Sequence, residues 1–340
     1  MYGWLERGSS IQLDRFTESI ADLLKYIAKR LLIAIPTIFG VTVLIFLIMR
    51  ALPGDPLAVF FDPSQIQLMS DAQRAGLMAD LGLDRPLATQ YLSWAGNALR
   101  GDLGTSFLRG DPIAETIGRR GAISAEIGIL SILIAWFIGL PIGILSAMRP
   151  NSIGDAVASM LSVVFLAIPG FWLGLLMILG FIHWFSYHPP IISSQLWQDP
   201  WLNLQIVAGP ALVLGMAQAA FVARMARSSL FEVFREDYVR TARAKGMKES
   251  VVLLRHALPN ALLPVITLSG VLLGFALGGS VTVEKAFNTP GLGNTLISGA
   301  IDRDHSMVQS IVLVYSMVFV GVNLLVDLSY SFLDPRIRVD

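Results

Sequence analysis

The sequence predicts an all-α polytopic membrane protein with six transmembrane helices and with both chain ends on the cytoplasmic side. Three observations lead to this prediction: an apolar composition, six apolar runs of sufficient length, and an uneven distribution of Lys and Arg. Hydrophobic residues make up 54% of the 340 residues and charged residues only 15%, whereas soluble domains average about 45–50% apolar and about 25% charged residues. The mean hydropathy is +0.64, so most of the chain is suited to lipid.

Six runs of the sequence are apolar enough to cross a hydrocarbon core, which takes about 20 residues. They are residues 31–49, 123–148, 156–185, 206–223, 261–283 and 307–328. The third run contains Pro169-Gly170, but two separate spans would need about 40 residues. We therefore expect one long kinked helix there, because neighbouring helices can satisfy the carbonyl group that a proline leaves free.

The orientation follows from the Lys and Arg residues, which are enriched in cytoplasmic loops. With the N-terminus inside, 16 of the 25 basic residues fall on the cytoplasmic side, and the short outer loops hold only Lys285 and Arg303. The remaining seven lie in residues 50–122, a loop too long for the rule to apply. Both termini are therefore predicted to be cytoplasmic.

The chain divides into an N-terminal extension at residues 1–23, a first transmembrane helix at 24–50, an outer cap at 51–122 and a five-helix core at 123–340. Apolar residues spaced by three and four around Ile20 and Leu24 indicate an amphipathic helix at the membrane surface; a disordered tail is the alternative. Leu92, Ala95 and Leu99 predict a helix in the cap, which is too long to be a bare connector.

Several kinds of function are excluded or made improbable by composition. The formal net charge is zero, so nothing favours a nucleic acid as partner. There is no cysteine, and the four histidines are scattered without metal-ligand spacing, so we expect no metal centre. No Gly-Lys dipeptide occurs, so the chain has no phosphate-binding loop of the P-loop type. If the protein takes part in a process driven by ATP, another chain hydrolyses the ATP.

The polar segment between the fourth and fifth spans carries the strongest motif. Glu236 and Asp237 precede Arg240 by four and three residues, so they can pair with it along a helix face. Gly246 can end that helix in a left-handed conformation, and Pro259 suits the first turn of the next span. We predict a short helix across the cytoplasmic face, within residues 232–250. An ordinary positively charged loop is the alternative.

This segment resembles the Glu-Ala-Ala-x3-Gly-x9-Ile-x-Leu-Pro loop of permease subunits in binding-protein-dependent ABC importers. Nine residues separate Gly246 from His256, and Leu258-Pro259 follow one residue later, as in the family. Arg240 stands where the general pattern has Glu, and His256 where it has Ile. Both departures resemble the variant of the dipeptide/oligopeptide/nickel branch.

Other segments resemble the B-type permease subunit of the same branch, over residues 24–338. They are Leu52-Pro53-Gly54-Asp55-Pro56, Leu81-Gly82-Leu83-Asp84-Arg85-Pro86, Gly101-Asp102-Leu103-Gly104, Asn288-Thr289-Pro290-Gly291-Leu292-Gly293 and Leu333-Asp334-Pro335-Arg336. The resemblance implies a type I ABC importer permease fold with a periplasmic cap, in the bacterial inner membrane. The cap would meet the substrate-binding protein; a simple lid over the helices is the alternative.

The resemblance also implies the partners: a second permease subunit, two cytoplasmic ATPase subunits that bind ATP and Mg²⁺, a periplasmic binding protein and membrane lipid. This chain itself would hold no cofactor and would not be an enzyme. The coupling helix would dock on an ATPase subunit. The candidate coupling residues are Glu236, Asp237, Arg240, Thr241, Ala242, Arg243, Ala244, Lys245, Gly246, His256, Leu258 and Pro259.

Candidates for the translocation path are fewer and rest on membrane physics. An ionisable residue inside a span is a functional candidate, which applies to Glu126, although its place near the outer boundary also lets it reach water. Gly270, Gly274 and Gly278 repeat every four residues; small residues at this spacing allow close helix packing and could also widen a passage. Gln218 completes the set.

Peptides are the expected cargo; nickel chelates, glutathione and glycosides, which the branch also carries, are alternatives. An intramembrane hydrolase is a different class, for which Ser131, Ser162 and His183 are the available residues, without a Gly-x-Ser-x-Gly context. A self-sufficient channel or secondary transporter is a third class, but the spans lack charge pairs.

Overall fold

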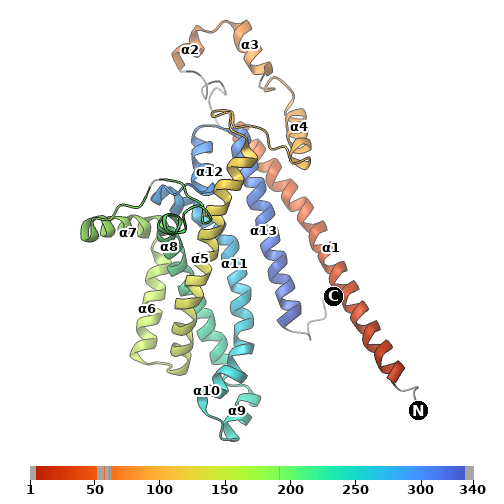
Figure 1. Ribbon diagram of the computed structural model, residues 1–340, viewed down its shortest axis with the longest axis vertical. Coiled ribbons are helices and arrows are strands. Elements are labelled where there is room, and N and C mark those ends of the chain that lie inside the picture. Colours follow the sequence, from red (N-terminus) through yellow and green to blue (C-terminus); the bar gives the residue numbers. More distant parts are fainter. Residues whose placement is uncertain are drawn as a thin grey trace.

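The computed structural model describes residues 5–51, 57, 61, 63–80, 82–190 and 192–333, and these residues are almost entirely helical (Figure 1). A single isolated bridge, between Thr105 and Pro112, is the only β-type pairing in the described part. The helices that build the membrane core and its flanks are α1 (Leu5–Ala51), α5 (Ile113–Met148), α6 (Ile153–Ala167), α7 (Gly170–Phe185), α8 (Pro200–Val233), α11 (Leu258–Phe287) and α13 (His305–Leu333).

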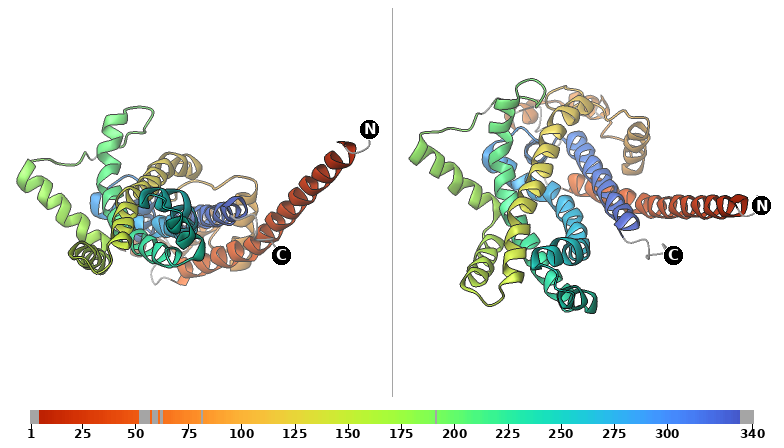
Figure 2. Two further views of the ribbon diagram at one scale, coloured as in Figure 1. Left: turned by 90° about the horizontal axis from the view of Figure 1, so that it is seen from below. Right: turned by 60° about the horizontal axis from the view of Figure 1, so that its bottom comes forward.

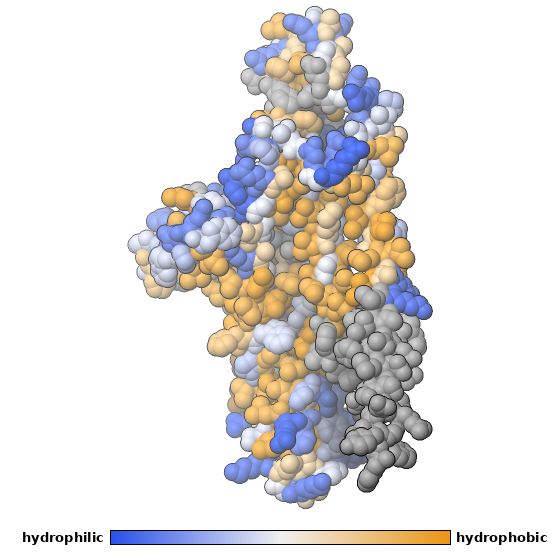
Figure 3. Space-filling model, turned by 45° about the vertical axis from the view of Figure 1, so that its right-hand side comes forward, coloured by the Kyte–Doolittle hydropathy of each residue, from blue (hydrophilic) through white to orange (hydrophobic). Residues whose placement is uncertain are grey.

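The number of membrane crossings agrees with the six predicted. Five helices are long and apolar enough to cross by themselves, and the pair α6 and α7 makes a sixth if it counts as one broken span. Figure 3 shows an apolar band around the middle of one face, with hydrophilic residues toward both ends. The N-terminal part of α1 and the C-terminal part of α13 both point away from the cap end (Figure 1).

The third predicted span is not one kinked helix, which corrects our expectation for residues 156–185. α6 and α7 meet at an angle of 101°. Ile168 is extended, with φ −83° and ψ 124°, because a proline disfavours the helical conformation of the residue before it. The helix restarts after Pro169. The 15 residues of α6 rise only about 22 Å, less than the roughly 30 Å hydrocarbon core, so α6 cannot span alone.

α5 and α8 pack closely, backbone against backbone. A Cβ atom on Gly139 or Gly143 of α5 would lie 2.6 Å from the carbonyl oxygen of Ala219 or Ala223 of α8, and one on Gly215 would lie 2.7 Å from the Ile134 side chain. Small residues let helix backbones approach this closely in a membrane. Gly215, Ala219 and Ala223, spaced by four residues along α8, therefore form a packing surface against α5, which contributes Gly139 and Gly143.

α7 is held to this core by an aromatic side chain from α11. The ring of Phe287 occupies the space beside Gly174 of α7 and Gly209 of α8, where Cβ atoms would come within 2.8 and 2.6 Å of it. Phe287 also packs on the buried apolar cluster that includes Ile123, Ile127 and Val283. The outer halves of α5, α7, α8 and α11 are thereby joined.

α1 extends as one helix from Leu5 to Ala51, with no break at the predicted boundary of residues 23 and 24. It stands beside α13 and its N-terminal part projects away from the other helices (Figures 1 and 2). Much of its apolar surface is uncovered; Leu32 is 67% exposed. Such a surface suits lipid contact.

The described part of the cap contains three helices, α2 (Pro63–Leu68), α3 (Asp71–Asp80) and α4 (Leu87–Leu99). α4 begins and ends close to where the Leu92, Ala95 and Leu99 spacing predicts. Its Tyr91 hydroxyl lies 2.9 Å from that of Thr42, and the Tyr91 ring packs edge-on against Phe46 of α1. α5 starts at Ile113, ten residues before the apolar run, so its charged first turns extend the helix beyond the predicted span.

The Asn288–Gly293 motif builds the junction between α11 and α12 (Leu292–Ile301). Glu284, fully buried, accepts hydrogen bonds from the Ser124 hydroxyl at 2.8 Å and from the Asn294 backbone N–H at 3.1 Å. The unpaired N–H groups of a helix's first turn favour a carboxylate. Gly291 and Gly293 leave the space for it, since Cβ atoms there would lie within 3.0 Å of its side chain.

The α5–α8 contact yields a stability prediction. Gly139→Ala places a Cβ against a backbone carbonyl, so we expect it to lower the free energy of unfolding by about 1–3 kcal/mol, the usual cost of overpacking. Gly118→Ala is the matched control on the same helix, since no atom lies within 4 Å of its added Cβ. Thermal unfolding in detergent measures both. Equal melting temperatures for the two variants would contradict the close packing.

Candidate functional site

The segment predicted as a coupling helix forms a short helix, α9 (Asp237–Ala244), at the end of the molecule opposite the cap (Figure 1). Its inward face is small and apolar: Val239 is fully buried and Ala242 is 5% exposed, and both pack with Val252. The predicted coupling residues on the other face are exposed, namely Glu236, Asp237, Arg240, Thr241, Arg243, Ala244, Lys245 and Gly246. α9 is thus seated on one side and free on the other.

The two arginines of α9 have different partners. Arg240 pairs with Asp237 at 3.6 Å, as the spacing predicts, with both side chains largely exposed. Arg243 instead holds both carboxylate oxygens of Glu249, at 2.5 and 3.1 Å, and its guanidinium carbon lies 5.2 Å from the Phe234 ring centroid. The hydrogen bond with Glu249 raises the pKa of Arg243 above its usual value. Arg243 therefore fastens the end of α9 to α10 (Glu249–Val251).

The turn after α9 depends on Gly246, whose φ is +73°. This is the left-handed conformation that the sequence predicts, and it suits glycine because a Cβ there is strained. The Gly246 and Met247 N–H groups donate to the carbonyls of Arg243 and Ala242. A cavity of about 340 Å³ opens beside the turn, lined by Met148, Pro150, Phe231, Phe234, Arg235, Arg243 and Glu249 together with Ala147.

The chain re-enters the core through a π-helical turn, η2 (Val252–Ala257), which sequence analysis does not predict. π-turns inside helices are rare, and those that occur often lie at functional sites. His256 lies in it, half-buried, and its Nε2 has no hydrogen-bond partner. Leu258 and Pro259 start α11, with Pro259 in the first turn as predicted. The Asn260 amide donates to the Tyr238 hydroxyl at 2.8 Å, which ties α11 to α9.

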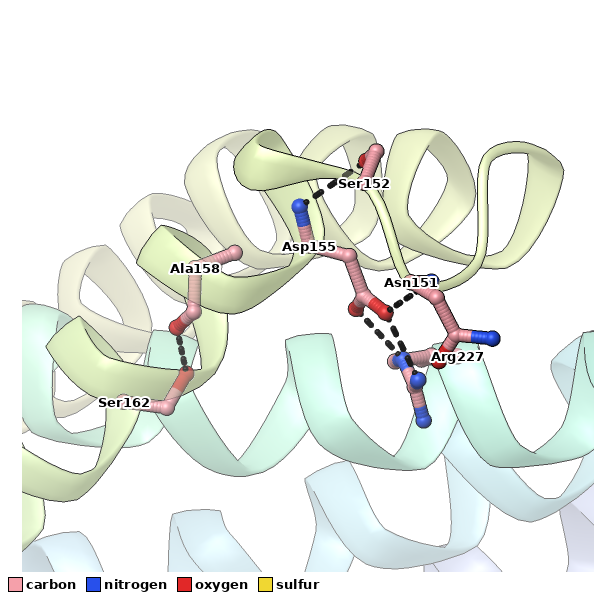
Figure 4. A network of polar contacts seen from close by, with 6 residues as sticks. All are labelled: Asn151, Ser152, Asp155, Ala158, Ser162 and Arg227. Carbon is pink, nitrogen blue, oxygen red and sulfur yellow. Dashed lines mark hydrogen bonds and ion pairs between the residues drawn. The ribbon is translucent and has the colours of Figure 1, made fainter.

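A partly buried ion pair joins α8 to α6 (Figure 4). Arg227 of α8 donates from Nε and Nη2 to the two carboxylate oxygens of Asp155 on α6, at 2.7 and 2.8 Å. Asp155 also accepts from the Asn151 N–H, and its own N–H donates to the Ser152 hydroxyl that caps α6. Sequence analysis missed this pair, because Arg227 reads as one loop cation among many and Asp155 falls just outside an apolar run.

The residues predicted for the translocation path have different surroundings. Glu126, partly buried, accepts a hydrogen bond from Asn203 of α8 at 2.7 Å. Cβ atoms on Gly270 and Gly274 would collide with Val326 and Phe319 of α13, so both serve close packing of α11 on α13.

The other two path candidates are less occupied by neighbours. No atom lies within 4 Å of an added Cβ at Gly278. Gln218 is 6% exposed, and its Oε1 has no hydrogen-bond partner. Gly278 therefore has open space beside it, and Gln218 has an unused hydrogen-bond acceptor.

A helical bundle with a short, half-exposed helix at one end and a cap at the other defines the membrane subunit of a transporter. Residues 139–339 match the family model described as binding-protein-dependent transport system inner membrane component. The chain belongs to this family. It is a multi-pass inner-membrane protein and the permease component of an ABC importer, not its ATPase.

Relatives match over nearly the full length. The chain is 39% identical to the oligopeptide transport system permease protein AppB of Bacillus subtilis (strain 168), covering 92% of this chain and 99% of that protein. It is 40% identical to the glutathione transport system permease protein GsiC of Escherichia coli (strain K12), covering 93% and 99%. GsiC of Pectobacterium atrosepticum is 41% identical, with the same coverage.

The fold also matches solved structures. Two crystal forms of the inward-facing MetNI methionine ABC transporter superpose with TM-scores of 0.54 and 0.53, at 18% and 19% identity. Each match covers 66% of this chain and 98% of the other. At this identity the likeness concerns the fold, which is the type I importer permease fold expected from the sequence.

The Asp155–Arg227 pair yields a second prediction. Asp155→Asn leaves the guanidinium without its counter-charge, and because Arg227 is 37% exposed we expect a loss of about 1–3 kcal/mol, below the value for a fully buried pair. Glu115→Gln is the control, since its pair with Arg119 is exposed on both sides. Thermal unfolding compares them. A melting temperature for Asp155→Asn as high as that of the control would contradict a structural role.

Proposed function

We propose that this chain forms, with a second permease subunit, the translocation path for short peptides that a periplasmic binding protein delivers. The observation that carries the proposal is α9: a helix seated by Val239 and Ala242 and offering a polar face on the cytoplasmic side. A surface of this kind suits docking on a cytoplasmic ATPase subunit, which would bind ATP and Mg²⁺. The names of the relatives, oligopeptide and glutathione permeases, support a peptide as cargo.

The roles of the individual coupling residues follow from their exposure. Arg240, Thr241 and Lys245 are free to contact the ATPase subunit, since they lie on the exposed face of α9. Ala242 and Arg243 act inside the segment, the first as a small packing residue and the second as the tie to Glu249. Closure of the ATPase on ATP would push α9 as a unit, and its seat would pass the displacement to α8 and α11. ATP binding would then favour one arrangement of the spans over another.

The turn at Gly246 gives a test of the coupling role. Gly246→Val forces a branched side chain into a left-handed conformation, at a cost of about 1–2 kcal/mol, while leaving room for the side chain itself. We expect transport per ATP hydrolysed to fall on the order of tenfold with normal membrane insertion. Uptake into proteoliposomes, measured together with phosphate release, checks this.

The matched control for that variant is Gly110→Val. Gly110 has a φ of +71° and equally open surroundings, but it lies in the cap. Unchanged coupling in Gly246→Val, or equal loss in both variants, would count against α9 as the coupling helix.

The cargo is tested by ATP hydrolysis of the assembled importer in lipid. We expect stimulation of several-fold by the binding protein loaded with a dipeptide, relative to the empty binding protein. Glutathione is the second candidate, favoured by the relatives that carry its name. Stimulation by the glutathione-loaded form alone would assign that cargo, and stimulation by neither would exclude peptides. Failure of the chain to assemble with an ATPase subunit would overturn the importer role.

A further inference from the structure

A second cavity, also of about 340 Å³, lies at the outer end of the molecule where α1 and α13 meet the cap. We call it the outer cavity. Five parts of the chain line it: the last turn of α1, the end of α3 with its following turn, α4, the segment 102–107, and the start of α13. Its lining residues include Arg50, Arg85, Gln90, Trp94, Asp102, His305 and Gln309.

Four nitrogen atoms around this cavity are buried and have no hydrogen-bond partner in the protein. They are Nη1 of Arg50, Nε1 of Trp94, Nδ1 of His305 and Nε2 of Gln309. Among the described residues nine buried side-chain atoms are in this state, and none of the other five belongs to a residue of the outer cavity. Leaving a buried polar group without a partner is unfavourable. Four of them around one space indicate a ligand that supplies the missing partners.

The side chain of Arg50, which lines the outer cavity, is held in place by several contacts. Its Nε donates to Gln90 Oε1 at 2.9 Å, and its guanidinium carbon lies 3.6 Å from the centre of the Phe46 ring. Gln90 in turn donates to the carbonyls of Leu83 and Arg85, at 3.3 and 2.8 Å. These contacts fix the plane of the guanidinium and leave Nη1 available.

The other donors are held on rigid elements. Gln309 is 2% exposed and lies one turn into α13, whose first turn is capped by Asp304. Trp94 lies on α4 beside Tyr91, the residue that docks α4 on α1. The Nη1, Nε1 and Nε2 groups can only donate, so the group that satisfies them is an acceptor. With a fixed positive charge among them, an anionic acceptor such as a carboxylate fits these donors.

The outer cavity also has one negative group. Asp102 lines it and is fixed by accepting a hydrogen bond from the Gly104 N–H at 2.9 Å. A donor cluster centred on Arg50 and a carboxylate in the same small space suit a solute that carries both charges. Pockets for small ligands have volumes of about 300–1,000 Å³, and this one is at the lower end.

We propose that the outer cavity binds a small zwitterionic solute of the class of short peptides, with its carboxylate at Arg50, Trp94, His305 and Gln309 and its ammonium group toward Asp102. The identity of the solute as cargo rests on the proposed function; the cavity and its chemistry do not. In an importer this site lies on the side from which the solute arrives. This site gives a role to the segments 83–90 and 101–104, which take no part in the proposed coupling to the ATPase.

The test is a calorimetric titration of the assembled importer in lipid nanodiscs, without ATP and without the binding protein. The probes are alanyl-alanine, its C-terminal amide and its N-acetyl form. We expect the amide to bind at least tenfold more weakly than alanyl-alanine, because it lacks the carboxylate. Asp102→Asn should remove the preference for the free amine over the acetylated form.

Variants assign the binding to the outer cavity. Arg50→Gln should weaken alanyl-alanine binding at least tenfold and make the acid and the amide bind alike. Gln309→Glu adds a negative charge, so it should weaken the acid at least tenfold and favour the amide over the acid. Trp94→Phe removes the indole N–H and keeps a smaller aromatic ring, so it should weaken binding a few-fold without affecting assembly. Arg100→Gln is the matched control: it removes a positive charge from the exposed end of α4, outside the cavity, and should change nothing.

The outcomes separate this proposal from the importer role. Equal binding of acid and amide by the unmodified complex, no binding, or full affinity in both Arg50→Gln and Trp94→Phe would overturn the outer-cavity site. If that happened while the loaded binding protein still stimulated ATP hydrolysis, only this proposal would fail. Carboxylate-dependent binding without any stimulation would support the site and contradict peptide import.

Discussion

The close contact of α5 with α8 is the constraint on which the other helices depend. Lipid supplies no hydrophobic force between helices, so association rests on packing at short range. Gly139 and Gly143 bring the α5 backbone against the carbonyls of Ala219 and Ala223, and the two helices stay together over most of their length. Because α8 leads into α9, and α5 ends at the cavity beside the turn after α9, this contact sets the place of α9.

α11 connects the two ends of the molecule through a different kind of interaction. At its cytoplasmic end it continues η2, whose Leu253 and Ala257 pack with Leu230 of α8. At its outer end Glu284 binds the first turn of α12 and the Ser124 hydroxyl of α5. Apolar contacts tolerate small sliding, whereas a buried carboxylate with several fixed donors does not. The outer end of α11 is therefore the more firmly held of the two.

Much of this arrangement could be predicted from the sequence because it depends on local chemistry. Hydropathy located the spans, the spacing of Leu92, Ala95 and Leu99 located α4, and the glycine at 246 predicted the left-handed turn. What the sequence could not predict depends on residues that meet only in the fold. The Asp155–Arg227 pair, the glycine partners on α5 and the outer cavity join positions tens to hundreds of residues apart, and no periodic pattern marks them.

The bend between α6 and α7 was missed for a different reason. A proline in an apolar run permits either a kinked helix or a break, and the choice depends on what surrounds it. Here Phe287 occupies the space between Gly174 and Gly209, so α7 is fixed against α8 and α11 by that ring. The break at Ile168 lets α7 reach this seat while Asp155 holds the start of α6 to Arg227. The ion pair fixes the start of α6, and the packing of Phe287 fixes α7. The angle between α6 and α7 follows from these two attachments.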